Sequence, residues 1–350
     1  EGDIIRDYSP MRSPKMSAFS MNLNRNKRSV ILDLKSEAGH RAALDLIASC
    51  DVFVTNLRRG ALERLGLDEA SVRAARTDIV YCVANGFGSE GPHADRAAYD
   101  DVIQAASGLS SMFAWSGDDP RFVPSIVADK ITGLHIAFAI AAALVGRRET
   151  GRGDTIEVPM AETVAAFNLV EHLGGQTFDP PFGGFSYERV RTPHRRPRRT
   201  ADGWIALLPY NSAAWQQFFD FGGRPELMDD PRFATAAGRV ENADALYGLL
   251  DDIVVHKTTA QWLEFCDRHS IPATDVNDLE QLGEDEHFKA VDLITRDEHP
   301  TEGLYHYVRD PIVRNGGHTP MRRHAPRLGA DTETVLREIG YDDEQISGLR

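Results

Sequence analysis

The chain has 350 residues, of which 42% are hydrophobic and 26% charged, and its formal net charge at pH 7 is −14. This composition indicates a folded soluble protein that is long enough for two domains. The acidic balance argues against general binding of nucleic acids or anionic membranes, although a local basic patch could still hold an anionic ligand. Because Cys50, Cys82 and Cys266 are widely separated, we expect no disulfide framework, no metal site and a reducing cytoplasm.

The N-terminal part of the chain alternates strand patterns with helix patterns. Three short apolar runs have the length of strands: residues 29–34, 51–55 and 78–84. One helix should follow its N-cap Ser36, and a second should run from Ala61 with a break near Gly66. This alternation predicts a parallel sheet covered on both faces, with ligands beyond the C-terminal strand ends, where residues 56–59 and 85–91 lie.

Two common nucleotide-binding motifs are missing from the sequence. No G-x-G-x-x-G follows a predicted strand, and no G-x-x-x-x-G-K-[ST] occurs. The nearest candidate, G-F-G-S-E-G-P at residues 86–92, is interpreted as a turn. Dinucleotide oxidoreduction and P-loop chemistry therefore lose support.

The stretch from Val123 to Met160 is the most informative part of the chain. An apolar run ends at Asp129, a helix of small and branched apolar residues is expected from Lys130 to Val145, and a strand follows at 155–158. Asp129 fits an N-cap at the mouth of a largely buried helix, and it also fits a carboxylate nucleophile. The two interpretations are compatible, because a helix N-terminus stabilises negative charge.

No membrane segment or leader is expected. The apolar core of that helix, residues 131–145, is shorter than the roughly 20 residues that a bilayer requires. The chain opens with E-G-D-I-I-R-D-Y, in which no signal peptide is visible. We therefore expect a cytoplasmic protein that does not enter a membrane.

The C-terminal half changes character after a linker rich in glycine and proline. Six arginines surround His194 within residues 189–199, and this cluster is either a solvated face or an anion site. A smaller α-rich domain should follow, with one strand at its start. Helices are expected at residues 99–109, 161–173, 213–222, 242–256, 259–268, 332–339 and 342–349, and strands at 204–209 and 304–314.

Six short segments resemble the class III CoA-transferases, the CaiB/BaiF family that includes formyl-CoA transferase and α-methylacyl-CoA racemase. They occur in family order and at family spacing: N-R-N-K-R-S-V-I-L-D-L-K (24–35), T-N-L-R-R-G-A-L-E-R-L-G-L (55–67), G-F-G-S-E-G-P (86–92), A-Y-D-D-V-I-Q-A-A-S-G-L (98–109), A-D-K-I-T-G (128–133) and R-R-E-T-G-R-G (147–153). Each segment alone would be weak, but six in register are strong.

The resemblance implies an α/β fold with a Rossmann-like, parallel-sheet large domain and a smaller α-rich domain. Against the family, the first β–α unit is absent from this chain. The implied divisions are a large coenzyme-binding domain at 1–185, a basic linker at 186–200, a small domain at 201–300 and a return to the large domain at 301–350. Family members form interlocked homodimers, so we expect one here.

The chemistry that the resemblance implies is transfer of CoA from an acyl-CoA to a small carboxylic acid. In the family, the residue that matches Asp129 attacks the thioester, giving an aspartyl anhydride and then an aspartyl-CoA thioester. The CoA thioester is a substrate, and no permanently bound cofactor is expected. The racemase branch is an alternative, but its catalytic histidine falls at Tyr99, which is a poor base at neutral pH. A non-catalytic CoA-binding protein is a further alternative.

The remaining site residues are assigned only by match to the family. The coenzyme site would be lined by Leu32 to Lys35, Asn56, Leu57, Arg58, Arg64, Ala97, Ala98, Tyr99 and Asp100. Lys35, Arg58 and Arg64 would meet the phosphates or the adenine, and Met160 would lie on the substrate side. Arg59 replaces a common proline, and Ala97 replaces a lysine found in some transferases. The sequence leaves open the acyl donor, the acceptor and the pathway.

Overall fold

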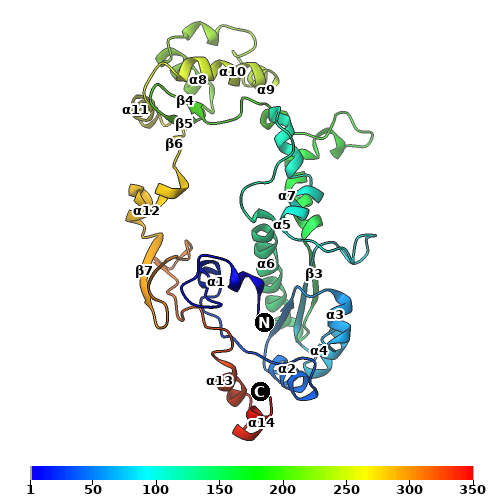
Figure 1. Cartoon of the computed structure of the whole chain (residues 1–350). Helices are drawn as coiled ribbons and strands as arrows, with labels where there is room; N and C mark the ends of the chain where they lie inside the picture. Colours follow the sequence, from blue (N-terminus) through cyan, green and yellow to red (C-terminus); the bar gives the residue numbers. More distant parts are fainter. Residues whose placement is uncertain (1, 350) are drawn as a thin grey trace. The chain divides into compact units, whose positions relative to one another are not determined.

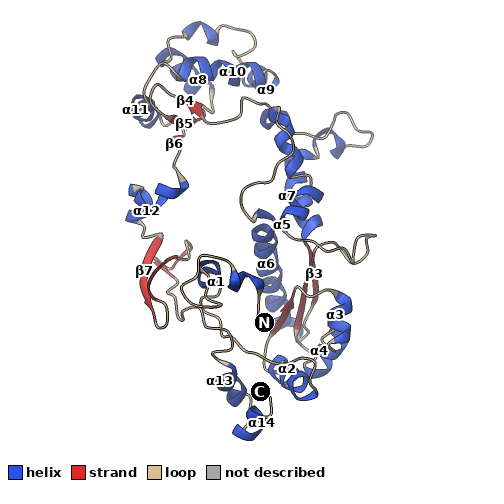
Figure 2. Ribbon diagram, in the orientation of Figure 1, coloured by secondary structure: helices blue, strands red, loops and turns tan. Residues whose placement is uncertain are grey.

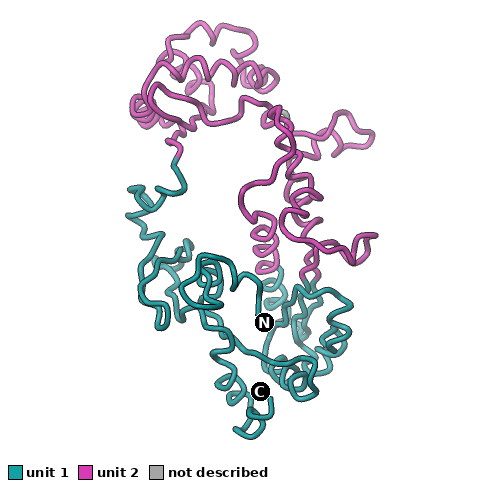
Figure 3. The backbone as a smooth tube through the Cα atoms, viewed as in Figure 1, with its two compact units in different colours: residues 1–83, 139–156, 277–350 teal, residues 84–138, 157–276 magenta. Residues whose placement is uncertain are grey.

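The computed structural model describes residues 2–349, apart from the side chain of Glu188, and the chain divides into two compact units (Figure 3). The first unit comprises Glu1–Val83, Ala139–Ile156 and Asn277–Arg350. The second comprises Ala84–Phe138 and Glu157–Val276. The domain limits expected from the sequence stay a prediction.

A three-stranded sheet with the order β1-β2-β3 follows the predicted alternation (Figure 1). Its strands are β1 (Val52–Thr55), β2 (Val80–Asn85) and β3 (Thr155–Pro159). β1 runs parallel to β2 with Val52 opposite Val80, which confirms the parallel arrangement for this pair. At Gly153 a side chain would collide with the Ile79 carbonyl oxygen, 2.0 Å from where its Cβ would lie. A residue without a side chain therefore lets the approach to β3 lie against the start of β2.

Helices α2 (Glu37–Ala48), α3 (Arg59–Arg64) and α4 (Glu69–Ala75) form where the sequence predicted helices. The Ser36 hydroxyl accepts from the Gly39 N–H at the start of α2, as an N-cap should. Gly66 separates α3 from α4 with φ of +60°, the left-handed conformation that favours glycine. These helices bury apolar side chains with the first two strands: Ile47, Leu62, Leu67, Val72, Ile79 and Tyr81.

The strand expected at residues 29–34 does not form. The Ser29 N–H donates to Asp331 Oδ2 at 2.9 Å, and the Ile31 N–H donates to Thr332 Oγ1 at 2.9 Å. Side chains at the start of the C-terminal helix α13 (Thr332–Glu338) thus satisfy this backbone in place of a neighbouring strand. The last helix is α14 (Asp343–Ser347), and both C-terminal helices agree with the prediction.

The rest of the first unit is short helices and hairpins (Figure 2). The single strand expected at 304–314 is wrong, because the chain forms β8 and then β9, with Pro311 between them. β7 pairs with β8 in an antiparallel hairpin. The elements are η1 (Ile4–Asp7), α1 (Ala18–Leu23), η6 (Leu279–Glu284), α12 (Glu286–Ala290), β7 (Ile294–His299), β8 (Gly303–Val308), β9 (Val313–Arg314) and β10 (Gly317–His318).

The long helix α6 (Val127–Thr150) differs from its prediction in length and in burial. It starts before Lys130 and runs past Val145, because Arg147 and Arg148 are good helix formers and the left-handed Gly151 ends it. Within residues 2–349 it is the one helix long and apolar enough to cross a membrane, and 17% of its most apolar window is buried. The expectations of a short and largely buried helix are therefore wrong.

The second unit begins with helices that pack around a small apolar cluster. Helix α5 (Asp100–Ala106) contacts α7 (Met160–His172), and both match predicted helices. The buried members of the cluster are Ile103, Ala128, Ala161 and Val164. Two 3-10 helices flank these elements, η2 (Ser110–Ser116) and η3 (Gly174–Thr177).

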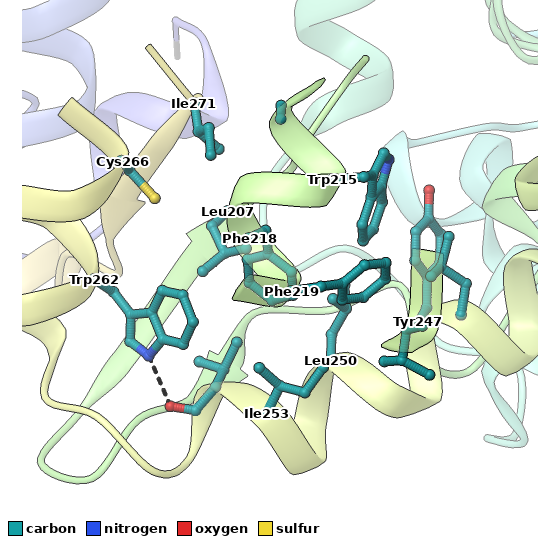
Figure 4. Close-up of a cluster of buried hydrophobic side chains, with 14 of the residues drawn as sticks. Leu207, Trp215, Phe218, Phe219, Tyr247, Leu250, Ile253, Trp262, Cys266 and Ile271 are labelled. Atoms are coloured by element: carbon teal, nitrogen blue, oxygen red, sulfur yellow. Dashed lines mark hydrogen bonds between the residues drawn. The ribbon is translucent and has the colours of Figure 1, made fainter. Parts of the chain in front are cut away.

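The C-terminal part of the second unit has its own aromatic core (Figure 4). The rings of Phe218 and Trp262 stack with centroids 5.2 Å apart, and Trp262 Nε1 donates to the Val254 carbonyl at 2.9 Å. Strands β4, β5 and β6 form an antiparallel sheet beside it. The elements are η4 (Glu188–Val190), β4 (Arg198–Arg199), β5 (Trp204–Leu207), α8 (Ser212–Phe221), η5 (Pro225–Met228), α9 (Ala236–Glu241), α10 (Ala243–Val254), α11 (Thr259–His269) and β6 (Ala273–Asp275).

Candidate functional site

Asp129 lies in the first turn of α6. The helix begins at Val127, so the prediction that Asp129 is its N-cap is wrong. N–H groups in a first helical turn lack a partner within the helix. The Asp129 N–H finds one outside, because it donates to Asp100 Oδ1 at 3.0 Å. Among the described residues no group donates a hydrogen bond to the Asp129 carboxyl, so it does not cap the helix, and the residue as a whole is accessible to solvent although its carboxyl group is partly screened from water.

Two side chains of α5 hold the start of α6. Asp100 is buried, and its second oxygen, Oδ2, accepts from Gln104 Nε2 at 2.6 Å. Gln104 is completely buried. Its amide oxygen accepts from the Val123 N–H at 2.9 Å, and its amide nitrogen also donates to the Ser125 carbonyl at 3.2 Å. Both residues therefore lie on the inner face of α5.

The surroundings of Asp129 raise the pKa of its carboxyl group above the usual 3.8. The main cause is partial withdrawal of the group from water, and the negative charge of Asp100 adds to it. Both effects disfavour the ionised form. A carboxylate with a raised pKa is more basic when ionised, which favours attack on an electrophilic carbon. A structural N-cap would show the reverse shift, because hydrogen bonds to a carboxylate lower its pKa.

Two apolar residues from the predicted site pack against the cluster that contains Ala128, the residue before Asp129. They are Ala98 and Met160, and both are partly buried. Tyr99 precedes α5 and is 78% exposed, so its phenol is open to solvent. Ala97 is exposed. The second unit thus groups Ala98, Asp100, Asp129 and Met160, which the sequence could place only one by one.

The glycine-containing turn at residues 86–92 is held by two carboxylates that sequence reasoning missed. Glu157 accepts from the Ser89 N–H at 2.9 Å and from Ser89 Oγ at 2.7 Å. Glu162 Oε1 accepts from the Gly88 N–H at 2.9 Å. Both acids lie near the junction of β3 and α7. Nothing local in the sequence ties them to a turn some 70 positions earlier.

The other predicted coenzyme residues belong to the first unit. Lys35, Asn56, Leu57, Arg58 and Arg64 all have exposed side chains. Arg58 precedes the first residue of α3, and its side chain makes no capping hydrogen bond. Of the three cations, Arg58 follows the end of β1 most closely in the chain, and exposed cations of this kind can bind anions.

Two further residues of the first unit, Leu32 and Arg59, were also singled out by the family match. Leu32 is partly buried and packs against the cluster that contains Leu336 and Ile346, so its side chain has a structural role. Arg59, where the family commonly has proline, pairs with Glu63 at 3.4 Å. That pair partly neutralises the basic surface. Within residues 2–349 no group of three His, Cys, Asp or Glu side chains is placed to hold a metal ion.

The family model "CoA-transferase family III" matches residues 1–332. The chain belongs to this family. Membership of a CoA-transferase family implies acyl-CoA and carboxylic acids as substrate classes.

Curated relatives match along nearly the whole length of this chain. The formyl-CoA:oxalate CoA-transferase of Bradyrhizobium sp. (strain ORS 278) is 28% identical, over 99% of this chain and 87% of the relative. A protein of the same name from Rhodopseudomonas palustris (strain BisB18) is also 28% identical, over 99% of this chain and 86% of the relative.

Solved structures agree with this fold. A CaiB/BaiF family protein from Brucella suis superposes with a TM-score of 0.78 at 25% identity, covering 97% of this chain and 89% of that one. Rv3272 from M. tuberculosis gives a TM-score of 0.76 at 25% identity, covering 90% of this chain and 85% of that one. The mixed α/β architecture expected for a class III CoA-transferase is confirmed.

Proposed function

We propose that this protein moves CoA from an acyl-CoA to a free carboxylic acid, with Asp129 as the nucleophile. The Asp129 carboxylate attacks the thioester carbon, forms an aspartyl anhydride and releases CoA thiolate. The thiolate attacks the aspartyl carbonyl, forms an aspartyl-CoA thioester and releases the first acid. The incoming carboxylate then attacks this thioester, and the same two steps in reverse yield the new acyl-CoA and free Asp129.

The observation that carries the proposal is the arrangement of Asp129. Asp129 is accessible to solvent, and its carboxyl group has a raised pKa and does not cap the helix. Its backbone N–H is held by a hydrogen bond to Asp100. A fixed nucleophile gains in rate because less freedom is lost on reaching the transition state. Membership of the CoA-transferase family and the curated relatives support the same reaction class.

We also propose the coenzyme and substrate contacts implied by the family match. Lys35, Arg58 and Arg64 would bind the phosphates or the adenine of CoA, and Met160 would lie beside the acyl group. The exposed side chains of the three cations leave them available for such contacts. The protein would act in the cytoplasm, without a permanently bound cofactor. It would work as an interlocked homodimer, for which the exposed apolar residues of α6 offer support.

The test is Asp129→Asn, which keeps the shape of the side chain and removes its nucleophilic charge. We expect transfer between succinyl-CoA, acetyl-CoA and a panel of free acids to fall by at least about four orders of magnitude, as for loss of other covalent nucleophiles. CoA binding should change by less than about threefold. The matched control is Glu149→Gln, an exposed acid near the other end of α6. Wild-type turnover in Asp129→Asn would rule out the role.

A racemase-type reaction is the alternative that the family leaves open. It would exchange the α-proton of an acyl-CoA with solvent, whereas CoA transfer leaves that bond intact. An acyl-CoA incubated with the enzyme in D₂O should therefore gain no α-deuterium. Rapid deuterium uptake would favour the racemase reaction instead.

A further inference from the structure

Arg189 in η4 is surrounded by tyrosines in the second unit. Its Nε donates to the Tyr247 hydroxyl at 3.0 Å. Its guanidinium carbon lies 5.1 Å from the centroid of the Tyr210 ring. The pKa of Arg189 is raised further, with its bond to the Tyr247 hydroxyl as the largest cause and with smaller contributions from Tyr210 and Tyr187, so Arg189 remains a cation at any physiological pH.

Two other arginines of the basic segment have carboxylate partners in the structure. Arg196 and Arg198 donate to the two oxygens of Asp251 at 3.1 and 2.9 Å. Among the side chains that the structure describes, by contrast, no carboxylate pairs with Arg189. Its partners are neutral phenols, although the guanidinium is only partly exposed. A cation partly withdrawn from water without a counter-charge is unfavourable until an anion joins it.

The geometry leaves hydrogen-bond donors for such an anion. A guanidinium has five N–H groups, and the tyrosine oxygens that accept from it keep their own O–H groups to donate. Tyr247 is buried on α10 and anchors Nε, whereas Tyr187 and Tyr210 are 41% and 72% exposed. The open side of the cluster therefore offers one fork of N–H groups with phenol hydroxyls beside it. This combination suits the flat, two-oxygen edge of a carboxylate or phosphate.

We propose that Arg189, Tyr187 and Tyr210 form a binding site for an oxyanion, either a carboxylate of an acidic substrate or a phosphate of the coenzyme. None of its three residues is among those that the family match assigns to catalysis or to the coenzyme. Under this proposal Arg189 binds a ligand, whereas Arg196 and Arg198 of the same basic segment bind Asp251 within the protein.

A structural role is the competing explanation. The bond between Arg189 and Tyr247 alone would tie η4 to α10, and Arg189→Gln could then act by loosening the fold. Tyr210→Phe separates the two roles, because it keeps the exposed ring and removes only the hydroxyl group. A purely structural contact predicts no effect of this variant on ligand binding.

The experiment is calorimetric titration of the full chain with two probes. CoA carries phosphates and no carboxylate, and succinate carries carboxylates and no phosphate. Arg189→Gln should lower the affinity for one of the two probes by about tenfold or more, the usual effect of losing a charge-assisted hydrogen bond. Tyr210→Phe should lower the affinity for the same probe by a smaller factor. Weaker binding of CoA by the variants identifies a phosphate as the ligand group, and weaker binding of succinate identifies a carboxylate.

The matched control is Arg195→Gln, which removes an exposed arginine from the same basic segment. It should leave both affinities unchanged. The proposal is overturned if Tyr210→Phe binds both probes as the wild type does, whatever the effect of Arg189→Gln, or if the wild type binds neither probe. Binding is measured without turnover, so the outcome does not depend on whether Asp129 is the nucleophile.

Discussion

At the scale of single residues, Asp129 and Asp100 have different tasks although both are aspartates close in space. Asp100 is buried, and its two carboxylate oxygens accept hydrogen bonds from the Asp129 N–H and from the Gln104 side chain. Asp129 is exposed and has a carboxyl group with a raised pKa. The Asp100 carboxylate thus fixes the backbone at the start of α6, whereas the Asp129 carboxylate is available for the proposed nucleophilic attack.

Gln104 is the residue on which this arrangement depends most. Gln104→Leu should leave Asp100 Oδ2 and the part-buried Val123 N–H without the partner that Gln104 supplies, at about 1–3 kcal/mol for each group. We expect a lower free energy of unfolding in urea. We also expect a fall in kcat larger than the change in KM, because the start of α6 would lose its fixed position.

A matched control exists for this substitution. Gln216 makes a similar bond to an aspartate one helical turn away, Asp220, at 2.8 Å, but on a more exposed part of α8. Gln216→Leu should change the free energy of unfolding by no more than about 0.5 kcal/mol and leave turnover unchanged. Equal effects of the two variants would contradict a special role for Gln104.

The sequence could identify some of these residues and not others. Asp129 was recognisable because a single acid between two apolar runs is unusual and matches a family motif. The burial of Gln104 was not, because α5 is short and its inner face is defined by segments 123–125 and α7. Glu157 and Glu162 were missed for the same reason, since their partners are distant in sequence.

At the scale of elements, α6 shows most clearly what a hydrophobic pattern can and cannot predict. Its apolar residues predicted a helix correctly, but apolarity does not say what covers it. Leu134, Phe138 and Val145 are 73%, 75% and 61% exposed. Their spacing of four and seven residues places them on one side of the helix. Exposed apolar surfaces of this kind mark sites of association.

We predict that this face of α6 is covered in the proposed homodimer. Phe138→Glu places a charge in that contact, so sedimentation should show the wild type as a dimer that resists dilution and the variant as mostly monomer. Val240→Glu, which changes a single exposed apolar residue on α9, should stay dimeric. A wild-type monomer that sediments with lipid vesicles would instead assign α6 to a membrane.

At the scale of the whole molecule, the alternation of strand and helix patterns predicted the sheet correctly at β1, β2 and β3. Local signals also located the helices around the aromatic core of Trp262, because each carries apolar residues at helical spacing. The strand predicted at residues 29–34 is absent. Its composition suits a strand, but its backbone bonds to side chains at Asp331 and nearby. Pairing between segments some 300 positions apart has no local signature.

The division of the chain also depends on such distant contacts. The first unit gathers segments from the start, the middle and the end of the chain. Composition breaks near the glycines at 183–184 marked a change of character, but contacts rather than composition define a compact unit. The resemblance to the family predicted the mixed α/β class, which the solved structures confirm, whereas the predicted domain limits remain untested.

The most direct test of the central claim is mass spectrometry of the enzyme after brief exposure to acyl-CoA and quenching in acid. Tryptic cleavage after Arg121 and Lys130 releases residues 122–130, in which Asp129 is the only acidic side chain. We predict that this peptide gains the mass of CoA less one water, as an aspartyl-CoA thioester requires, and that Asp129→Asn abolishes the adduct. An unmodified peptide during active CoA transfer, or an adduct on another residue, would contradict the account.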